Sequence, residues 1–411
     1  MLPAPANGAE KRASAPRRSP QLRALAVALL TLLLSLPAAL IVIRSWTEPY
    51  RPRLATTGAD EVVKGLSVIR TALNSPDELL LFGSSELTFQ DEYHPARLFQ
   101  AKPTGFTTVV VGSGYRQSLN NVMALGALGG DLKGKKLVCF LSPTWFEKPI
   151  ADKAFQKNFS LLQTYETIFS PDLTWALKHR IAERLLSLGA PATDDGLLRA
   201  AMQAIVADSP ARYHALWPFG RAAISAYRAK DEVQLAQLLS AKSLKPVPAP
   251  RPQTIDWKGL DQKAKQEAAV KTTSNRFGIY DDYYLKYVAN RIEKVKDSGQ
   301  GERWLDSSEW EDLRLQLDLL REVEAKPLFI SIPVLGPWYD FKGHPSSDRQ
   351  AYYQQVKSMV EQAGFPVVDL GYGEYEPGFM RDPWHPGWKG GVAIARAIDQ
   401  YYHDGLSSAD H

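Results

Sequence analysis

In the stretch ELLLFGSSELTF, residues 78–89, four apolar residues are followed directly by a glycine and two adjacent serines. The apolar run is short and nearly continuous, which is typical of a strand buried on both faces of a parallel sheet. Glycine and serine are ordinary turn residues, so Gly83, Ser84 and Ser85 could simply end that strand. The alternative is a nucleophile at the carboxyl end of a strand, where open α/β sheets present their reactive groups.

Further apolar runs of the same kind alternate with helical patterns along the chain. The runs are TTVVV (107–111), KLVCFL (136–141), PLFISIPV (327–334) and FPVVDL (365–370), and the expected helices cover 116–128, 308–324, 347–363 and 389–403. This alternation predicts an α/β fold built on a parallel sheet. Residues 150–300 interrupt it with Ala- and Leu-rich sequence and a Pro-rich joint, KPVPAPRPQ (245–253). We interpret this region as a helical insertion between the third and fourth strands.

The positive charge of the 411-residue chain is concentrated at its amino terminus. The formal net charge is +4, and residues 1–23 carry five basic residues and one acidic residue, which leaves the remainder balanced. A balanced body argues against nucleic acid as a partner, because phosphate binding needs a concentrated positive face. The single cysteine, Cys139, permits no intramolecular disulfide. No residues have the spacing of zinc ligands, so we expect neither a metal nor a cofactor.

Residues 24–43, ALAVALLTLLLSLPAALIVI, contain no charged side chain over 20 positions. At 1.5 Å per residue, a helix of this length matches a bilayer core of roughly 30 Å, so we expect a transmembrane anchor. A cleaved signal peptide is the rival interpretation, but its apolar run is usually shorter and a clear cleavage site is missing. The basic residues before the span favour a single-pass protein with a cytoplasmic tail at 1–23 and an extracytoplasmic body at 44–411.

A nucleophilic serine needs a base, and the base needs a carboxylate to orient it. RDPWHPGWKGG (381–391) offers such a pair, because Asp382 precedes His385 by three residues just before an expected helix. One tight turn could hold Asp382 against one imidazole nitrogen and aim the other nitrogen at Ser85. A D-x-x-H pattern also suits a loop hydrogen bond and a surface histidine, and the residues alone leave both interpretations open.

An acyl-transfer site also needs hydrogen-bond donors for an oxyanion. VVVGSGYRQSL (109–119) ends the second expected strand in a turn that contains Gly112 and Gly114. Backbone N–H groups in such a turn can face a ligand without a Cβ in the way. A phosphate-binding turn is the competing interpretation, although the sequence lacks the Gly-Lys-Ser/Thr of a P-loop.

Gly-x-Ser after the first strand, glycine after the second and D-x-x-H near the carboxyl terminus resemble the SGNH hydrolase fold, a three-layer sandwich around a parallel sheet. More specifically, the chain resembles the DltD proteins of teichoic-acid D-alanylation. The motifs that carry this resemblance are GSSEL (83–87), EYHPARLF (92–99), GSGYRQSL (112–119), SPTWF (142–146), WYDFKG (338–343) and EPGFMRDPWHPGWKG (376–390). They extend over nearly the whole chain.

The resemblance implies a catalytic role for three of these residues. It makes Ser85 the nucleophile, at the usual Gly-x-Ser position, with Ser84 as the neighbouring alternative. It makes His385 the general base and Asp382 the carboxylate that orients it.

The resemblance also implies an oxyanion site, with two departures from the family pattern. Gly114 and the Ser85 backbone N–H are the implied donors, and Gly112 lies in the same turn. SGNH enzymes carry an asparagine after the third strand, which is missing here. Thr144 in SPTWF stands where DltD relatives usually have glutamine, and its hydroxyl can donate one hydrogen bond over a shorter reach.

The function that the resemblance implies is transfer of a D-alanyl group, as an ester, onto a hydroxyl of an envelope polymer. A membrane-embedded O-acyltransferase would pass the acyl group across the membrane, and a cytoplasmic D-alanyl carrier protein would supply it indirectly. One alternative is an esterase or O-acetyltransferase of an exopolysaccharide, which the same triad would serve. Another is a noncatalytic membrane-anchored scaffold that binds the acyltransferase or the polymer.

Overall fold

The computed structural model describes residues 20–54, 65–88, 91–147 and 151–404. The chain divides into two compact units, Met1–Trp46 and Thr47–His411, which are described separately. The described residues of the first unit lie in helix α1 (Pro20–Thr47), which contains Pro37. The helices of the described chain include none with the length and hydrophobicity that a membrane crossing requires. The anchor expected over residues 24–43 stays a prediction.

The second unit is built on one sheet of five strands in the order β2-β1-β3-β4-β5. Each pair of neighbouring strands runs parallel. The strands are β1 (Glu78–Gly83), β2 (Thr107–Gly112), β3 (Lys136–Leu141), β4 (Lys326–Ser331) and β5 (Val367–Asp369). Their apolar side chains are mostly buried, as a parallel sheet covered on both faces requires. The predicted parallel α/β fold is confirmed.

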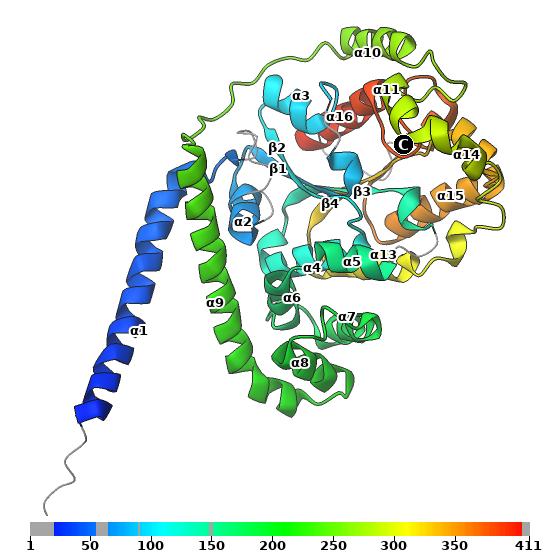
Figure 1. Ribbon diagram of the computed structural model, residues 1–411. Helices are drawn as coiled ribbons and strands as arrows, with labels where there is room; N and C mark the ends of the chain where they lie inside the picture. The colour runs from blue at the N-terminus through cyan, green and yellow to red at the C-terminus, as the bar shows by residue number, and fades with distance from the viewer. Residues whose placement is uncertain (1–19, 55–64, 89–90, 148–150, 405–411) are drawn as a thin grey trace, which may run out of the picture. The chain divides into compact units, whose positions relative to one another are not determined.

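Helices cover both faces of this sheet (Figure 1). On one face α3 and α16 pack together, and on the other α4 packs against α13. In addition, α2 packs against β1, and α15 packs against β4 and β5. The bounds are α2 (Leu66–Asn74), α3 (Pro95–Ala101), α4 (Ser118–Leu128), α13 (Glu309–Glu322), α15 (Ser346–Gln362) and α16 (Trp388–His403).

The chain between β3 and β4 is largely helical before it reaches α13. Its helices are α5 (Ala151–Asn158), α6 (Leu161–Ile168), α7 (Trp175–Leu188), α8 (Gly196–Val206), α9 (Pro210–Lys242), α10 (Trp257–Lys271), α11 (Asp281–Tyr283) and α12 (Ile292–Val295); α14 (Gly336–Lys342) follows β4. α6 lies close against α4, since a Cβ at Gly126 would come within 2.6 Å of the Thr167 side chain. The insertion is therefore packed onto the helical layer of the sheet.

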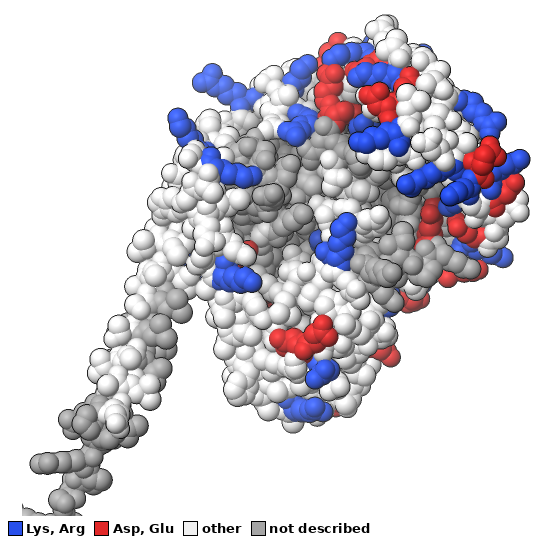
Figure 2. Space-filling model, in the orientation of Figure 1, with Lys and Arg blue, Asp and Glu red and all other residues white. Residues whose placement is uncertain are grey.

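Basic and acidic side chains are mixed on the visible face of the second unit. Figure 2 shows Lys and Arg interspersed with Asp and Glu over the region of α10, α11 and α14. The mixture agrees with the balanced charge of the body in the sequence.

Two glycines end β1 and β2 side by side, with Gly83 in register with Gly112. A Cβ at Gly112 would lie 3.1 Å from the Gly83 carbonyl oxygen and 3.1 Å from the Leu87 side chain. A Cβ at Gly83 would collide with the Glu86 carboxylate. The missing side chains let the 3-10 turn η4 (Ser85–Leu87) fold back over the ends of both strands.

Glu78, the first residue of β1, carries a buried carboxyl group. Its Oε1 accepts the Arg53 N–H at 2.8 Å, while its Oε2 has no hydrogen-bond partner within the described chain. Burial raises the pKa of Glu78 from 4.5 to about 7. The folded state therefore holds a proton that the unfolded chain releases at lower pH, and this group's contribution to stability falls as the pH rises from about 4.5 to 7.

We expect Glu78→Gln to reduce the loss of stability between pH 5 and pH 8 by about 1–3 kcal/mol, because the amide cannot ionise. Denaturant unfolding of both proteins at the two pH values measures the difference. An unchanged pH dependence in the variant would contradict the expectation.

Candidate active site

Ser85 lies in η4, two residues after the end of β1. Its Oγ is 2.9 Å from Nε2 of His385, which lies 300 residues further along the chain. Nδ1 of the same imidazole is 2.9 Å from each of the two carboxylate oxygens of Asp382. The three side chains form one hydrogen-bonded series that runs from a hydroxyl through an imidazole to a carboxylate.

A tight loop before α16 holds the acid and the base. The ends of the loop, residues 380 and 386, pair in an antiparallel bridge. Oδ1 of Asp382 accepts the backbone N–H groups of Trp384 at 2.9 Å and His385 at 3.0 Å. Asp382 is fully buried. The backbone of the loop therefore fixes the carboxylate, and the carboxylate in turn orients the imidazole.

The hydroxyl of Ser84 points elsewhere. It donates to the Ser113 carbonyl at 3.3 Å, and the residue is only 3% exposed. Of the two adjacent hydroxyls, Ser85 is the one that the structure brings to an imidazole.

A second carboxyl group, that of Glu86, lies in the turn that carries Ser85. Oε1 of Glu86 accepts the Ser84 N–H at 2.5 Å, and the residue is buried. Burial raises the pKa of Glu86, and the hydrogen bond from the Ser84 backbone opposes that rise because it favours the carboxylate. The Glu86 side chain therefore fixes the backbone of the turn.

His94, from the EYHPARLF motif, also fixes the turn that contains Ser85 and Glu86. Its Nδ1 accepts the Ala96 N–H at 3.1 Å, so its Nε2 carries the proton and donates to the Glu86 carbonyl at 3.2 Å. Burial lowers the pKa of His94 to about 4. The neutral imidazole thus anchors the turn.

The turn after β2 holds Gly114 in open surroundings. A Cβ at Gly114 would meet no atom within 4 Å. The Gly114 carbonyl accepts a hydrogen bond from Nδ2 of Asn158 at 3.1 Å, and Oδ1 of Asn158 accepts the Ser113 hydroxyl. Next to it, Tyr115 has a φ of 69°, an uncommon backbone conformation for a residue other than glycine. Asn158 lies at the end of α5 and not directly after β3, so its position along the chain gave no sign of this contact.

Thr144 lies in the 3-10 turn η6 (Pro143–Trp145) that follows β3. Its Oγ1 is 2.9 Å from Oγ of Ser142. The oxyanion role that the resemblance implies for Thr144 stays a prediction.

Residues 20–54, 65–88, 91–147 and 151–404 contain no group of three or more His, Cys, Asp or Glu side chains placed to hold a metal ion. The chemistry available from the groups described above is proton transfer and nucleophilic attack by a hydroxyl.

Comparison with known proteins identifies the family. The family model described as "DltD protein" matches residues 55–403. The chain belongs to the DltD family. The resemblance inferred from the motifs is confirmed over most of the sequence.

Curated DltD proteins from three bacteria match with similar coverage. Protein DltD of Bacillus subtilis (strain 168) is 33% identical over 358 residues, which cover 85% of this chain and 89% of the relative. Protein DltD of Staphylococcus aureus (strain NCTC 8325 / PS 47) is 29% identical over 355 residues, with 84% and 86% covered. Protein DltD of Lacticaseibacillus rhamnosus is 27% identical over 349 residues, with 84% and 82% covered. The family match over residues 55–403 includes Ser85, Asp382 and His385.

Gly114→Val tests the turn after β2. We expect the variant to fold with nearly wild-type stability, because the space around a Cβ at this position is open. We expect turnover to fall roughly 10²-fold, the effect of losing one oxyanion donor, because the new side chain would block the turn. Acyl transfer and thermal unfolding measure the two quantities.

Gly112→Ala is the matched control for that variant. Its Cβ would press on the Gly83 carbonyl oxygen, so we expect a loss of stability instead. Full activity in Gly114→Val would place the oxyanion donors elsewhere.

Proposed function

We propose that this DltD protein is a serine-dependent O-acyltransferase or esterase that moves D-alanyl groups, as esters, onto a hydroxyl of an envelope polymer such as teichoic acid. Membership of the DltD family supports the D-alanyl chemistry. The observation that carries the enzymatic part is the series Ser85–His385–Asp382, with 2.9 Å at each step.

In the proposed first half-reaction, Nε2 of His385 takes the proton of Ser85 as Oγ attacks the carbonyl carbon of the acyl donor. The bond from that carbon to the donor oxygen then breaks, and the imidazolium returns the proton to the leaving oxygen. Asp382 keeps the second imidazole proton on Nδ1 and stabilises the imidazolium. The product is an acyl ester on Ser85.

In the second half-reaction, a hydroxyl of the polymer attacks the acyl carbon of that ester. His385 takes the proton of the attacking hydroxyl and gives it to the departing Oγ of Ser85, so the free enzyme is restored. Water in place of the polymer hydroxyl would make the same site an esterase. The backbone N–H groups of Ser85 and Gly114 are the proposed oxyanion donors in both steps.

The proposed reaction places the body outside the cytoplasm, held by the anchor predicted at 24–43. The acyl donor would come from a membrane-embedded O-acyltransferase, which a D-alanyl carrier protein serves on the cytoplasmic side. A cysteine introduced at an exposed body position, such as Lys242→Cys, should react with an impermeant reagent in intact cells, or in spheroplasts where an outer membrane is present. Labelling only after lysis would put the body in the cytoplasm and remove this pathway.

The function is tested by the amount of D-alanine ester bound to the envelope. A gene deletion should lower it, and the wild-type gene should restore it while Ser85→Ala should not. An unchanged ester content in the deletion strain would reject the D-alanyl function and favour the esterase or O-acetyltransferase of an exopolysaccharide. Restoration by Ser85→Ala would favour the noncatalytic scaffold.

A further inference from the structure

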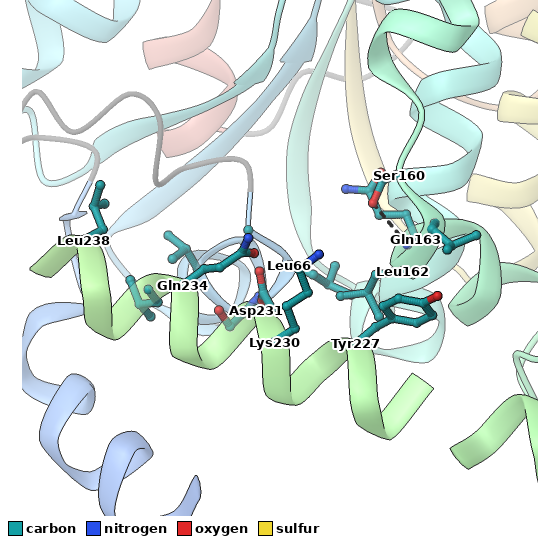
Figure 3. A pocket seen from close by; sticks show the side chains of 14 residues that line it. Leu66, Ser160, Leu162, Gln163, Tyr227, Lys230, Asp231, Gln234 and Leu238 are labelled. Atoms are coloured by element: carbon teal, nitrogen blue, oxygen red, sulfur yellow. Dashed lines mark hydrogen bonds between the residues drawn. The ribbon is translucent and has the colours of Figure 1, made fainter. Parts of the chain in front are cut away.

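A pocket of about 510 Å³ lies between the amino-terminal turns of α2 and α6 and one face of α9 (Figure 3). Its volume is within the range of sites that bind small molecules. It shares no lining residue with the series of Ser85, His385 and Asp382. Its wall at α6 begins at Ser160, two residues after the asparagine that contacts the turn following β2.

Gln163 presents an unused amide to this pocket. The residue is only 6% exposed, and it lines the pocket from the first turn of α6. Its backbone N–H donates to Oγ of Ser160 at 3.3 Å, but its side-chain amide makes no hydrogen bond to any residue that the structure describes. The amide group, with two N–H donors and one carbonyl acceptor, is therefore available to a ligand in the pocket.

The start of α6 adds further donors beside that amide. The first N–H groups of a helix have no acceptor within the helix, and the helix end carries a partial positive charge. Leu161 and Leu162 hold such positions and line the pocket. At the start of α2, by contrast, the Ser67 N–H already donates to Oδ2 of Asp231 at 2.8 Å. The amino-terminal end of α6 is therefore a better position for an anion than the amino-terminal end of α2.

Lys230 of α9 brings a full positive charge to the same pocket. Among the residues described, no carboxylate lies within ion-pair distance of its ammonium. Asp231, the next residue, is the one acidic residue of the lining, and its Oδ2 already accepts the Ser67 N–H. The rest of the wall is mixed: Leu66, Leu235 and Leu238 are apolar, and the polar side chains include Ser67, Tyr227 and Gln234.

We propose that this pocket binds a phosphate ester. The phosphate would lie at the amino terminus of α6, held by the Gln163 amide and the Lys230 ammonium, with its organic part along the leucines. Amide and ammonium donors at a helix amino terminus are the groups that proteins use for phosphate. A soluble polyol phosphate and the headgroup of a glycerophospholipid share this chemistry. The site is separate from catalysis at Ser85.

The test measures binding to the full-length chain by calorimetry, with glycerol 3-phosphate in one arm and dihexanoylphosphatidylglycerol below its micelle concentration in the other. We expect saturable binding in at least one arm. Binding of glycerol 3-phosphate would identify a polyol phosphate as the sufficient unit. Binding of the lipid alone would identify a membrane headgroup, and both results support the proposal.

Matched variants show whether the binding occurs in this pocket. Gln163→Met and Lys230→Met keep the length of the side chain and should each weaken binding roughly tenfold. Asp231→Asn keeps an acceptor for the Ser67 N–H and should tighten binding, because it removes the opposing charge. Lys242→Met removes a charge from the same helix outside the pocket and should change nothing.

Ser85→Ala should bind as the wild type does, so a failure of the proposed catalytic function would leave this result intact. Absence of saturable binding in both arms would overturn the proposal. So would binding to Gln163→Met and Lys230→Met that equals binding to Lys242→Met.

Discussion

Ser85→Ala is expected to leave the protein folded and to lower turnover by roughly 10⁴- to 10⁶-fold, the scale seen when a member of a catalytic triad is removed. The loss follows from the geometry, because Oγ of Ser85 is the atom that lies 2.9 Å from the His385 imidazole. The folding expectation follows from the position of Ser85, which is partly exposed in a turn. Transfer of D-alanine to the polymer and thermal unfolding measure the two effects.

Ser84→Ala is the matched control for this prediction. It removes a neighbouring hydroxyl that donates to the Ser113 carbonyl, so we expect a stability loss of about 1 kcal/mol and a much smaller effect on turnover. A harmless Ser85→Ala beside an inactive Ser84→Ala would shift the nucleophile by one residue. If both variants keep their activity, the scaffold interpretation gains support.

His385→Ala should lose as much turnover as Ser85→Ala, because base and nucleophile act as one unit. The double variant should then be little worse than either single variant. A multiplicative loss in the double variant would mean that the two residues act independently.

Asp382→Asn is expected to lower turnover by about 10⁴-fold without unfolding the loop. The asparagine oxygen can still accept the N–H groups of Trp384 and His385. Its NH₂ group would face Nδ1 of the imidazole, which would then carry its proton on Nε2. An imidazole in that tautomer cannot accept the proton of Ser85.

The tautomer can be read directly, by the ¹⁵N shifts of the His385 ring in wild type and variant at neutral pH. Asp382→Ala is the control, since it removes the carboxylate and also the acceptor for the loop N–H groups, and it should destabilise the protein as well. An active Asp382→Asn would show that the carboxylate is dispensable.

Short continuous apolar runs predicted the central strands because local composition decides them. The runs that end at residues 82, 111 and 141 correspond to β1, β2 and β3 to within one residue. The run at 327–334 was too long, since β4 ends at Ser331 although its apolar residues continue into the core. Strand order could not be predicted in this way, because pairing depends on contacts between distant segments.

The candidate site also combines local contacts, which the sequence can predict, with contacts between distant segments, which it cannot. Asp382 and His385 could be found because their contact is local, three residues apart within one turn. Asn158 could not be found, because the end of α5 reaches the turn after β2 only through the folded insertion. The contact of His94 could not be predicted either, because its partner is the backbone carbonyl of Glu86 and every residue carries such a carbonyl.

The 300 residues between Ser85 and His385 also determine when the candidate site can be assembled. During synthesis the turn that carries Ser85 emerges early, whereas His385 emerges only after the helical region between β3 and β4 and the last two strands. A nascent chain therefore has the serine without the imidazole that contacts it in the folded protein. A truncation before this loop would also remove α16, whose Val392, Ile394 and Ile398 are buried, so the last segment of the chain completes the core and the candidate site together.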